Sequence, residues 1–365
     1  MTTPNRPERA DAPNPPQQTD GHEDRPLSHQ GPPLSHRDQT LSDRDGPLGQ
    51  DQTLSPQDHT LSILRTERPR LIDLAYRLLG SLADAEDVVQ EAYVRWYAMS
   101  PQARQAIEVP GAWLSRVTSR ICLDQLRSAR VRRENYVGEW LPEPLPDRTE
   151  WTGGRPGGRS VEPADPADRV TLDESVNMAF LVVLDSMTPA ERVAFILHDV
   201  FRYSFAEVGE IVGRTPAACR QLASSARRRM RASHSPAGPA APAATASRRA
   251  ALVRDFKQAW QAMDIEALIG LLDPGATALA DGGGLAAAVP HPIEGSTEIV
   301  RYMSALAAKL SHQKVLERTV NGQPGLVIQE DGVTVSVLAF DFSGEKITRL
   351  WAVRNPEKLR TWTAG

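Results

Sequence analysis

The spacing of apolar residues divides the chain into helical stretches and strand-forming stretches. From Ile63 to Tyr136, apolar residues recur every three or four positions, which predicts amphipathic helices. A second stretch with the same period runs from about Arg169 to Ala232. Three later runs, LVIQE, VTVSVLAFDF and KITRLWAVR, alternate apolar and polar residues, which predicts β-strands. We therefore expect a multidomain protein with two all-α blocks followed by a C-terminal α+β module.

Polar and proline-rich segments separate these blocks. Residues 1–56 contain no aromatic residue, valine or isoleucine, so they cannot bury enough apolar surface to offset the entropy of ordering. We expect a disordered tail there, and flexible linkers at 141–168, which is rich in proline and glycine, and at 233–247. The predicted domains are two helical domains at 57–140 and 169–232 and an α+β domain at 248–365.

The composition argues against several classes of protein. Cys122 and Cys219 lie far apart with no CxxC motif, which disfavours a disulfide framework or a zinc site and suits a reducing compartment. His22, His29 and His36 recur every seven residues, but in a flexible polar tail they do not predict a metal site. No run of about 18 apolar residues and no secretory signal is present. We predict a cytoplasmic protein with no membrane association, no metal and no other cofactor.

The stretch GRTPAACRQLASSARRRMR, residues 213–231, contains six arginines and no acidic residue. On a helix at about 100° per residue, most of its basic residues lie opposite an apolar stripe. Thr215 can cap this helix, and Pro216 fits its first turn. Upstream, SFAEVGEIVG forms a short capped helix that ends at Gly213, with the small Gly209 where the two helices would cross.

A short helix, a glycine turn and a basic helix together predict a helix-turn-helix. The alternative, a solvated basic face on an ordinary bundle, does not account for the preceding helix. Base edges would be reached by Arg220, Gln221 and Ser224, and phosphates by Arg214, Arg227 and Arg228. The residues predicted to bind DNA here are Arg214, Thr215, Ala217, Arg220, Gln221, Ser224, Arg227 and Arg228.

A second basic stripe lies in the first helical block. Its arginines fall within an arc of about 80° on a helical projection; they are Arg116, Arg120, Arg127 and Arg130. Trp113 and Tyr136 flank the stripe, and arginine beside aromatic residues suits melted DNA, in which unpaired bases can stack. Trp113 also has a structural interpretation as an anchor of the core. Two basic helices joined by a linker could hold two separated DNA sites.

Two longer stretches of the sequence resemble a known family. AYRLLGSLADAEDVVQEAYVRW resembles region 2, and SMTPAERVAFILHDVFRYSFAEVGEIVGRTPAACRQLASSARRRM resembles region 4, of extracytoplasmic-function sigma factors of bacterial RNA polymerase. The resemblance covers about residues 60–232. It implies that the protein binds core RNA polymerase and promoter DNA, reads the minus-35 element with region 4, and recognises and melts the minus-10 element with region 2.

Three further motifs resemble the sigma-J-like subgroup: NYVGEWLPEPL, DGGG at 281–284 and NPEKL at 355–359. That resemblance implies a fused SnoaL-like C-terminal domain with the cone-shaped NTF2-like fold. Such a domain would act as a built-in regulator that contacts the sigma domains, so a separate anti-sigma factor is not expected. Leu285 stands where the family often has lysine, and Glu357 replaces a common aspartate.

The resemblance also implies roles for particular residues. An acidic face would meet the polymerase β′ clamp, with region 4 at the β flap; the face comprises Asp84, Glu86, Asp87, Gln90 and Glu91. These acids could instead, or also, favour the helix dipole, with Asp84 as the cap. The residues expected to take part in regulation are Asp281, Gly282, Gly283, Gly284, Asn355, Pro356, Lys358 and Leu359.

The C-terminal domain raises the question of catalysis, because NTF2-like cones include enzymes that use a buried acid. The candidates Asp281, His291, Glu294 and Asp341 have no spacing that demands catalysis, and Asp281 fits a turn. We therefore expect no enzyme activity. Two alternatives to a sigma factor remain: a ligand-sensing helix-turn-helix regulator that works without core polymerase, and an NTF2-like enzyme with a DNA-binding appendage.

Overall fold

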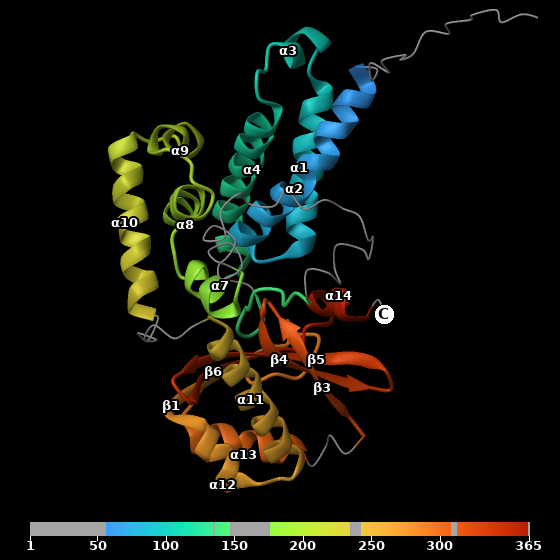
Figure 1. The fold of residues 1–365 in the computed structure, drawn as a ribbon, viewed down its shortest axis with the longest axis vertical. Helices are drawn as coiled ribbons and strands as arrows, with labels where there is room; N and C mark the ends of the chain where they lie inside the picture. The colour runs from blue at the N-terminus through green and yellow to red at the C-terminus, as the bar shows by residue number, and fades with distance from the viewer. Residues whose placement is uncertain (1–55, 134–135, 147–175, 234–241, 308–311, 364–365) are drawn as a thin grey trace, which may run out of the picture. The chain divides into compact units, whose positions relative to one another are not determined.

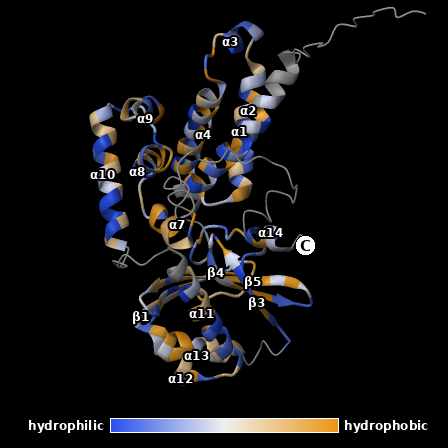
Figure 2. Cartoon of the chain, viewed as in Figure 1, coloured by the Kyte–Doolittle hydropathy of each residue, from blue (hydrophilic) through white to orange (hydrophobic). Residues whose placement is uncertain are grey.

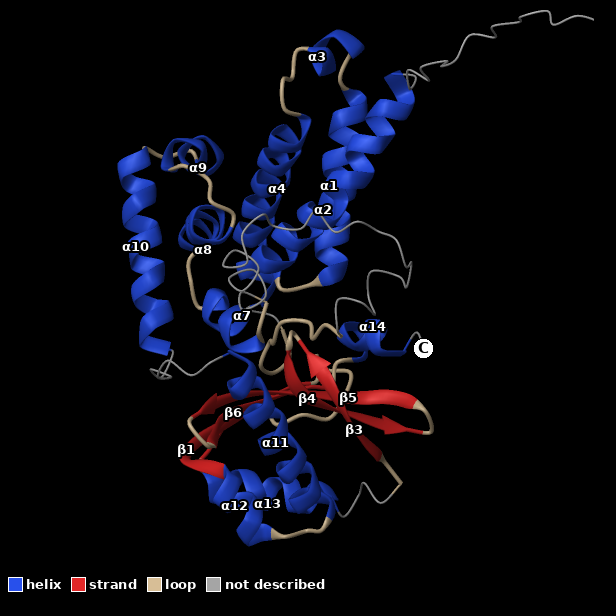
Figure 3. Ribbon diagram, in the orientation of Figure 1, coloured by secondary structure: helices blue, strands red, loops and turns tan. Residues whose placement is uncertain are grey.

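The computed structural model describes residues 56–133, 136–146, 176–233, 242–307 and 312–363 (Figure 1). The disordered tail predicted for residues 1–56 lies outside the described residues except for Pro56, as does the predicted linker from residue 147 onward. Figure 3 shows that the described strands all lie in the C-terminal part of the chain and that the part before it is helical, as the apolar patterns predict.

The first helical domain consists of four helices, three of which bury residues in a common core. They are α1 (Pro56–Leu79), α2 (Leu82–Ala98), α3 (Pro101–Gln105) and α4 (Pro110–Arg133). The cap expected at Asp84 is wrong: Ser81 caps α2, accepting a hydrogen bond from the Asp84 amide at 3.2 Å. α2 therefore begins at the buried Leu82, and Asp84 lies in its first turn, where its charge favours the helix dipole.

The second helical domain contains the predicted helix-turn-helix. Its elements are α7 (Met178–Asp185), α8 (Pro189–Phe195), the π-helical turn η1 (Ile196–Val200), α9 (Phe205–Val212) and α10 (Pro216–Ser233). The capping boxes predicted from Thr188 to Glu191 and from Ser204 to Glu207 are both confirmed. These caps satisfy the free amides of α8 and α9 and fix where each short helix begins.

The two helical domains share one apolar core, which extends from Leu64 in α1 to Ala226 in α10. Buried Arg192 of α8 joins them: its guanidinium donates to the Leu78 carbonyl and to the Asp185 carboxylate, each at 2.9 Å. Because its guanidinium binds both a carbonyl and a carboxylate, the charge of Arg192 is compensated inside the core.

The C-terminal domain is built on a six-stranded sheet with the order β2-β1-β6-β5-β4-β3. Its strands are β1 (Leu272–Asp281), β2 (Ile293–Glu294), β3 (Lys314–Val320), β4 (Gln323–Glu330), β5 (Val333–Ser343) and β6 (Lys346–Val353). All pairs are antiparallel except β1 with β6. The three predicted strands are confirmed as β4, β5 and β6. β1 was not predicted, because Pro274 and Gly275 interrupt its pattern where the β1–β6 register shifts.

Both faces of this sheet are covered. One face packs against α11 (Pro242–Gln261), α12 (Ile265–Leu271) and α13 (Ser296–Ala307). α11 begins within the segment predicted as the linker 233–247. The opposite face packs against Leu141, which follows the first helical domain, against Met178 of α7, and against Leu359 of the 3₁₀ turn η2 (Pro356–Leu359), which precedes α14 (Arg360–Thr363). The architecture is that of the expected NTF2-like α+β fold, with its second face used for contacts between domains.

Candidate functional site

The helix-turn-helix has the local geometry that its sequence predicts. Gly213 ends α9 in a left-handed conformation, with φ of 74°. A Cβ atom at Gly209 would lie 2.7 Å from the Arg214 carbonyl oxygen, so only glycine fits where the turn crosses α9. The Thr215 hydroxyl accepts a hydrogen bond from the Ala218 amide at 3.2 Å and caps α10. These contacts fix the angle at which α10 leaves the turn.

Most of the residues predicted to bind DNA with α10 are exposed, and the polar positions of this helix appear in blue in Figure 2. The exposed residues are Arg214, Thr215, Ala217, Arg220, Gln221 and Arg228. The Arg220 guanidinium lies 5.4 Å from the centre of the Phe205 ring, which supports its stem. Ser224 and Arg227 are half-buried. Arg227 binds Asp199 at 2.7 and 3.2 Å, so in this structure its guanidinium is occupied by a carboxylate that lies far away in the sequence.

Two residues of the arginine stripe of α4 contact α9 of the helix-turn-helix. Arg116 forms an ion pair with Glu210 of α9 at 3.0 Å, and Arg120 donates to the Glu210 carbonyl at 2.8 Å. Arg127 pairs with Asp124 on its own helix at 3.1 Å. Arg130 lies in α4, but its side chain is outside the described residues. Two of the arginines predicted to bind melted DNA are therefore engaged by the other helical domain.

The acidic face of α2 is exposed and continues into an apolar surface. Asp84, Asp87, Gln90 and Glu91 are exposed, whereas Glu86 is half-buried. Glu86 pairs with Arg68 at 3.2 Å, and Glu91 pairs with Arg95 at 2.5 Å. One turn and two turns further along lie Val94 and Tyr97, whose exposed fractions are 67% and 49%. The sequence interpretation missed these two residues, although Val94 lies three residues after Glu91 and Tyr97 three residues after Val94, which places them on the same face.

Asp281 is the centre of a buried site between the C-terminal domain and the segment 136–146. Its side chain is fully buried and accepts three hydrogen bonds: from the Tyr136 hydroxyl at 2.7 Å, the Leu141 amide at 2.9 Å and the Lys358 ammonium at 2.7 Å. The expectation that Asp281 forms a turn is wrong, because it is the last residue of β1 and faces a partner segment. The carboxylate is compensated by a cation and two neutral donors.

Asn355 and the glycine loop shape the pocket around Tyr136. The Asn355 amide donates to the Tyr136 hydroxyl at 2.9 Å, while its oxygen caps η2. A Cβ atom at Gly283 would lie 2.3 Å from that amide nitrogen and 3.0 Å from the Tyr136 oxygen, and one at Gly284 would lie 3.2 Å from Val137. Burial and the hydrogen bond to Asp281 raise the pKa of Tyr136 above its ordinary value, so the phenol stays a donor.

Lys358 closes the site from the C-terminal side. Its ammonium donates to the Leu141 carbonyl at 2.5 Å and lies 4.2 Å from the Trp140 ring centre. The neighbouring Leu359 packs beside Leu141, while Pro356 begins η2 and is exposed. The residues of both regulatory motifs therefore converge on one stretch of chain, residues 136–141.

A second polar contact, which the sequence interpretation missed, lies further along the same segment. Buried Asn321 accepts from the Leu145 amide at 3.0 Å and donates to the Tyr76 hydroxyl at 2.8 Å and to the Val176 carbonyl at 3.0 Å. It thus joins the sheet to α1, to Leu145 at the start of the predicted linker 141–168, and to Val176 just before α7. Its sequence signal was the Asn321-Gly322 dipeptide, which predicts only a hairpin turn.

Glu143 fastens the segment to the first helical domain. It is buried, and its carboxylate accepts from the Leu82 amide at 2.7 Å, while its own amide donates to the Gly80 carbonyl at 2.8 Å. Burial raises the pKa of Glu143 to about 7, although the Leu82 hydrogen bond and the charge of Lys358 oppose this rise. All six residues from Leu141 to Pro146 are buried, so the start of the predicted linker is a packed element in this structure.

The four candidate catalytic residues do not form a site. His291 and Glu294 are exposed, Asp341 lies 3.7 Å from Arg349, and none of these residues, nor Asp281, lines the cavity of the domain. Within the described ranges, no cluster of three or more potential metal ligands occurs. No helix among the described residues has the length and apolar character needed to cross a membrane.

Comparison with known proteins matches the two helical domains to families. Residues 63–132 match Sigma-70 region 2, and residues 177–230 match Sigma-70, region 4. The ECF RNA polymerase sigma factor SigJ of Mycobacterium tuberculosis is 37% identical over 305 residues, which cover 80% of this chain and 90% of SigJ. The probable ECF RNA polymerase sigma factor SigI of the same species is 35% identical, covering 81% of this chain and 93% of SigI.

A solved structure extends the similarity to the whole architecture. The crystal structure of Mycobacterium tuberculosis extracytoplasmic function sigma factor SigJ aligns with a TM-score of 0.60 and 32% sequence identity. The alignment covers 83% of this chain and 98% of that structure, so it includes the C-terminal α+β domain as well as the helical domains.

Proposed function

The chain belongs to the extracytoplasmic-function family of RNA polymerase sigma factors, and we propose that its C-terminal domain regulates it in cis. As a sigma factor, it acts with core RNA polymerase on promoter DNA to start transcription. The regulatory proposal rests on the buried contact of Asp281 with Tyr136, Leu141 and Lys358. Through this contact the C-terminal sheet holds the chain that connects regions 2 and 4.

We assign promoter recognition to the two basic helices. The exposed face of α10 would read the minus-35 element, with Arg220, Gln221 and Ser224 at base edges and Arg214 and Arg228 at phosphates. Arg227 would join the phosphate contacts only after leaving Asp199.

The arginine stripe of α4 would hold the melted minus-10 element. Extruding bases from the duplex costs a few kcal/mol, which binding to polymerase and to the stripe would offset.

The polymerase contact is assigned to the exposed face of α2. Its acids would meet a basic surface on the β′ clamp, and Val94 and Tyr97 would supply the apolar centre of that contact. Region 4 would rest on the β flap. Among the described residues, all of this face except the half-buried Glu86 is exposed, so the first encounter with polymerase would not require the regulatory contact to open.

In the regulated state, the two DNA-binding helices are held in a restrained arrangement. Glu210 of α9 binds Arg116 and Arg120, so α9 lies against the arginine stripe of α4. Asp281 and Asn321 hold the start of the linker at Leu141 and Leu145, and Asn321 also binds Val176, just before α7. We expect regions 2 and 4 to move apart when the protein reads two promoter elements at once, so that polymerase would have to release these contacts. A separate anti-sigma protein is not needed for such restraint.

No catalytic step is assigned to the C-terminal domain. Sigma factors as a family are not enzymes, and the candidate residues Asp281, His291, Glu294 and Asp341 are either exposed or bound to partner groups. The Asp281 carboxylate in particular already accepts three hydrogen bonds.

Run-off transcription with purified core polymerase tests the function. We expect promoter-specific transcripts that depend on the chain, and we expect Asp281→Ala to change their yield while leaving binding of a minus-35 duplex intact. A ligand-sensing regulator independent of polymerase would instead bind duplex tightly and give no transcript. Equal transcript yields from wild type and Asp281→Ala would contradict regulation in cis without affecting the sigma assignment.

A further inference from the structure

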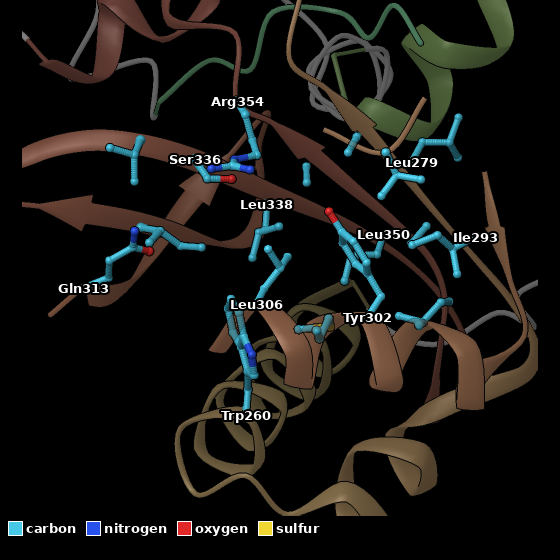
Figure 4. A pocket seen from close by; sticks show the side chains of 18 residues that line it. Trp260, Leu279, Ile293, Tyr302, Leu306, Gln313, Ser336, Leu338, Leu350 and Arg354 are labelled. Atoms are coloured by element: carbon cyan, nitrogen blue, oxygen red, sulfur yellow. The ribbon is translucent and has the colours of Figure 1, made fainter. Parts of the chain in front are cut away.

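The C-terminal domain contains an apolar cavity on the sheet face opposite to the Asp281 site (Figure 4). Its wall is formed by β1, β5 and β6, and its floor by Trp260 of α11 and by Tyr302, Met303 and Leu306 of α13. The volume of the cavity that is open to the centre of a water molecule is about 80 Å³. Since one water needs roughly 10–15 Å³ on this measure, the cavity has room for roughly five to eight non-hydrogen atoms.

The chemistry of the lining points to one kind of ligand. The described lining residues include no aspartate or glutamate, and their single charged residue is Arg354 at the end of β6. Ser336 of β5 lies next to Arg354, one position beyond the cross-strand pair of Val337 with Val353. In Figure 4 the Arg354 side chain points into the cavity, and the Tyr302 hydroxyl points toward the strands. The end of the cavity at Arg354 and Ser336 therefore offers a positive charge and a hydrogen-bond donor, and the other lining residues are apolar apart from Tyr302 and Gln313.

Arg354 can bind a ligand without giving up its present partner. Its guanidinium donates to the Ala287 carbonyl on the loop that follows the DGGG motif. A guanidinium has five N–H donors, so others remain for an anion. With no acid in the lining to neutralise it, a small anion at this end would be attracted both by charge and by bidentate hydrogen bonds.

We propose that this cavity binds a small, mostly apolar carboxylic acid, with its carboxylate on Arg354 and its hydrocarbon chain between the sheet and α13. An apolar cavity with a few convergent polar groups is the usual form of a small-molecule site. The site is distinct from the promoter, polymerase and interdomain contacts described above.

The position of the cavity couples it to the interdomain site. Successive residues of a strand face opposite sides of the sheet. At the end of β1, Ala280 lines the cavity while Asp281 holds the linker; just after β6, Arg354 lines the cavity while Asn355 holds Tyr136. The Arg354 amide also donates to the Asp281 carbonyl at 2.7 Å. A ligand that binds this arrangement of β1 and β6 stabilises the linker contact by mass action. This coupling rests on the proposed regulation in cis, whereas the binding does not.

Calorimetric titration of the full chain with sodium hexanoate, and with 1-hexanol as the neutral analogue, tests the binding. We expect saturable binding of hexanoate that weakens about tenfold or more in Arg354→Gln, with hexanol binding changed less than about twofold. Ala352→Leu, which fills the cavity from β6, should abolish binding of both, and Ala280→Leu provides a second filling variant should the first not fold by circular dichroism. No saturable hexanoate binding, equal loss of both ligands in Arg354→Gln, or full binding in a folded filled variant would each overturn the proposed site.

Hydrogen exchange of the same samples tests the coupling. Saturating hexanoate should slow amide exchange across residues 136–145 of the wild type and leave it unchanged in the filled variant. Unchanged or faster exchange in wild-type protein that binds hexanoate would overturn the coupling alone. The transcription assay with Asp281→Ala reports on regulation in cis independently, so failure of that proposal is distinguishable from failure of the ligand site.

Discussion

The ammonium of Lys358 lies 2.7 Å from a carboxylate oxygen of Asp281, and both groups bind the backbone of Leu141. The carboxylate takes the Leu141 amide, and the ammonium takes its carbonyl. A single residue of the connecting chain is thus held through both of its backbone groups. Because such groups are costly to bury without partners, the ion pair makes this burial possible.

The glycine at position 283 should be indispensable for the contact with Tyr136. Gly283→Ala places a methyl group against the Asn355 amide and the Tyr136 oxygen, so we expect Tyr136 to be displaced and chymotrypsin to cleave after Trp140 faster. Gly344→Ala is the matched control: Gly344 has the same positive φ of 60°, but a Cβ atom there meets nothing within 4 Å. Equal cleavage rates in the two variants would contradict the steric role.

The buried Glu143 carboxyl should make attachment of the linker depend on pH. Its pKa is raised from 4.5 to about 7, so between these values the attached state binds more protons than the free chain does. The contact should therefore weaken as pH rises from about 4.5 to 7, by about 1.4 kcal/mol per unit and roughly 3 kcal/mol in total. Glu143→Gln, which cannot ionise, should flatten this dependence. Chymotryptic cleavage after Trp140 across this pH range, corrected for protease activity, gives the measurement, and a slope shared by both proteins would count against it.

Removing the Glu210 carboxylate should make the arginine stripe of α4 more accessible to DNA. In Glu210→Gln, Arg116 loses its ion pair, and we expect the free protein to bind a single-stranded promoter oligonucleotide about two- to fivefold more tightly. The gain is modest because both partners are partly exposed and because the Arg120 hydrogen bond is to the backbone. Glu298→Gln, which removes an exposed acid in α13, is the control for net charge, and an equal gain in that variant would dismiss a specific role of Glu210.

Two arginines of α10 should differ in how they affect promoter choice. Arg220→Ala should cost about 1–3 kcal/mol on the preferred minus-35 duplex and less on a scrambled one, because Arg220 is placed to reach a base. Arg228→Ala should weaken both duplexes alike, as expected for a phosphate contact. Fluorescence anisotropy at a fixed salt concentration measures both. If Arg220→Ala weakened the two duplexes equally, its assignment to a base edge would be incorrect.

The local features of this fold were predictable from sequence, and the contacts between distant segments were not. Capping boxes and the glycine turn depend only on residues close together in the sequence. The starts of α8, α9 and α10 could therefore be predicted from the sequence alone. The regulatory motifs could be located only through a family resemblance.

Glu143, Asn321 and the pairing of Arg227 with Asp199 escaped prediction, because each depends on a partner from another element. The proline-rich composition of residues 141–146 predicts a linker, yet a chain without regular structure can be buried when its polar groups find partners elsewhere.

Hydrogen exchange of the free full-length protein tests the central claim, which is that the C-terminal domain holds the chain joining regions 2 and 4. We expect strong protection of the Leu141 and Leu145 amides in the wild type. We expect protection at Leu141 to be lost in Lys358→Met, because removing one partner of a buried ion pair costs about 3–5 kcal/mol, and to be retained in Lys346→Met, which alters an exposed lysine of β6. Exchange of both amides in the wild type at the rate of an unstructured chain would contradict the account.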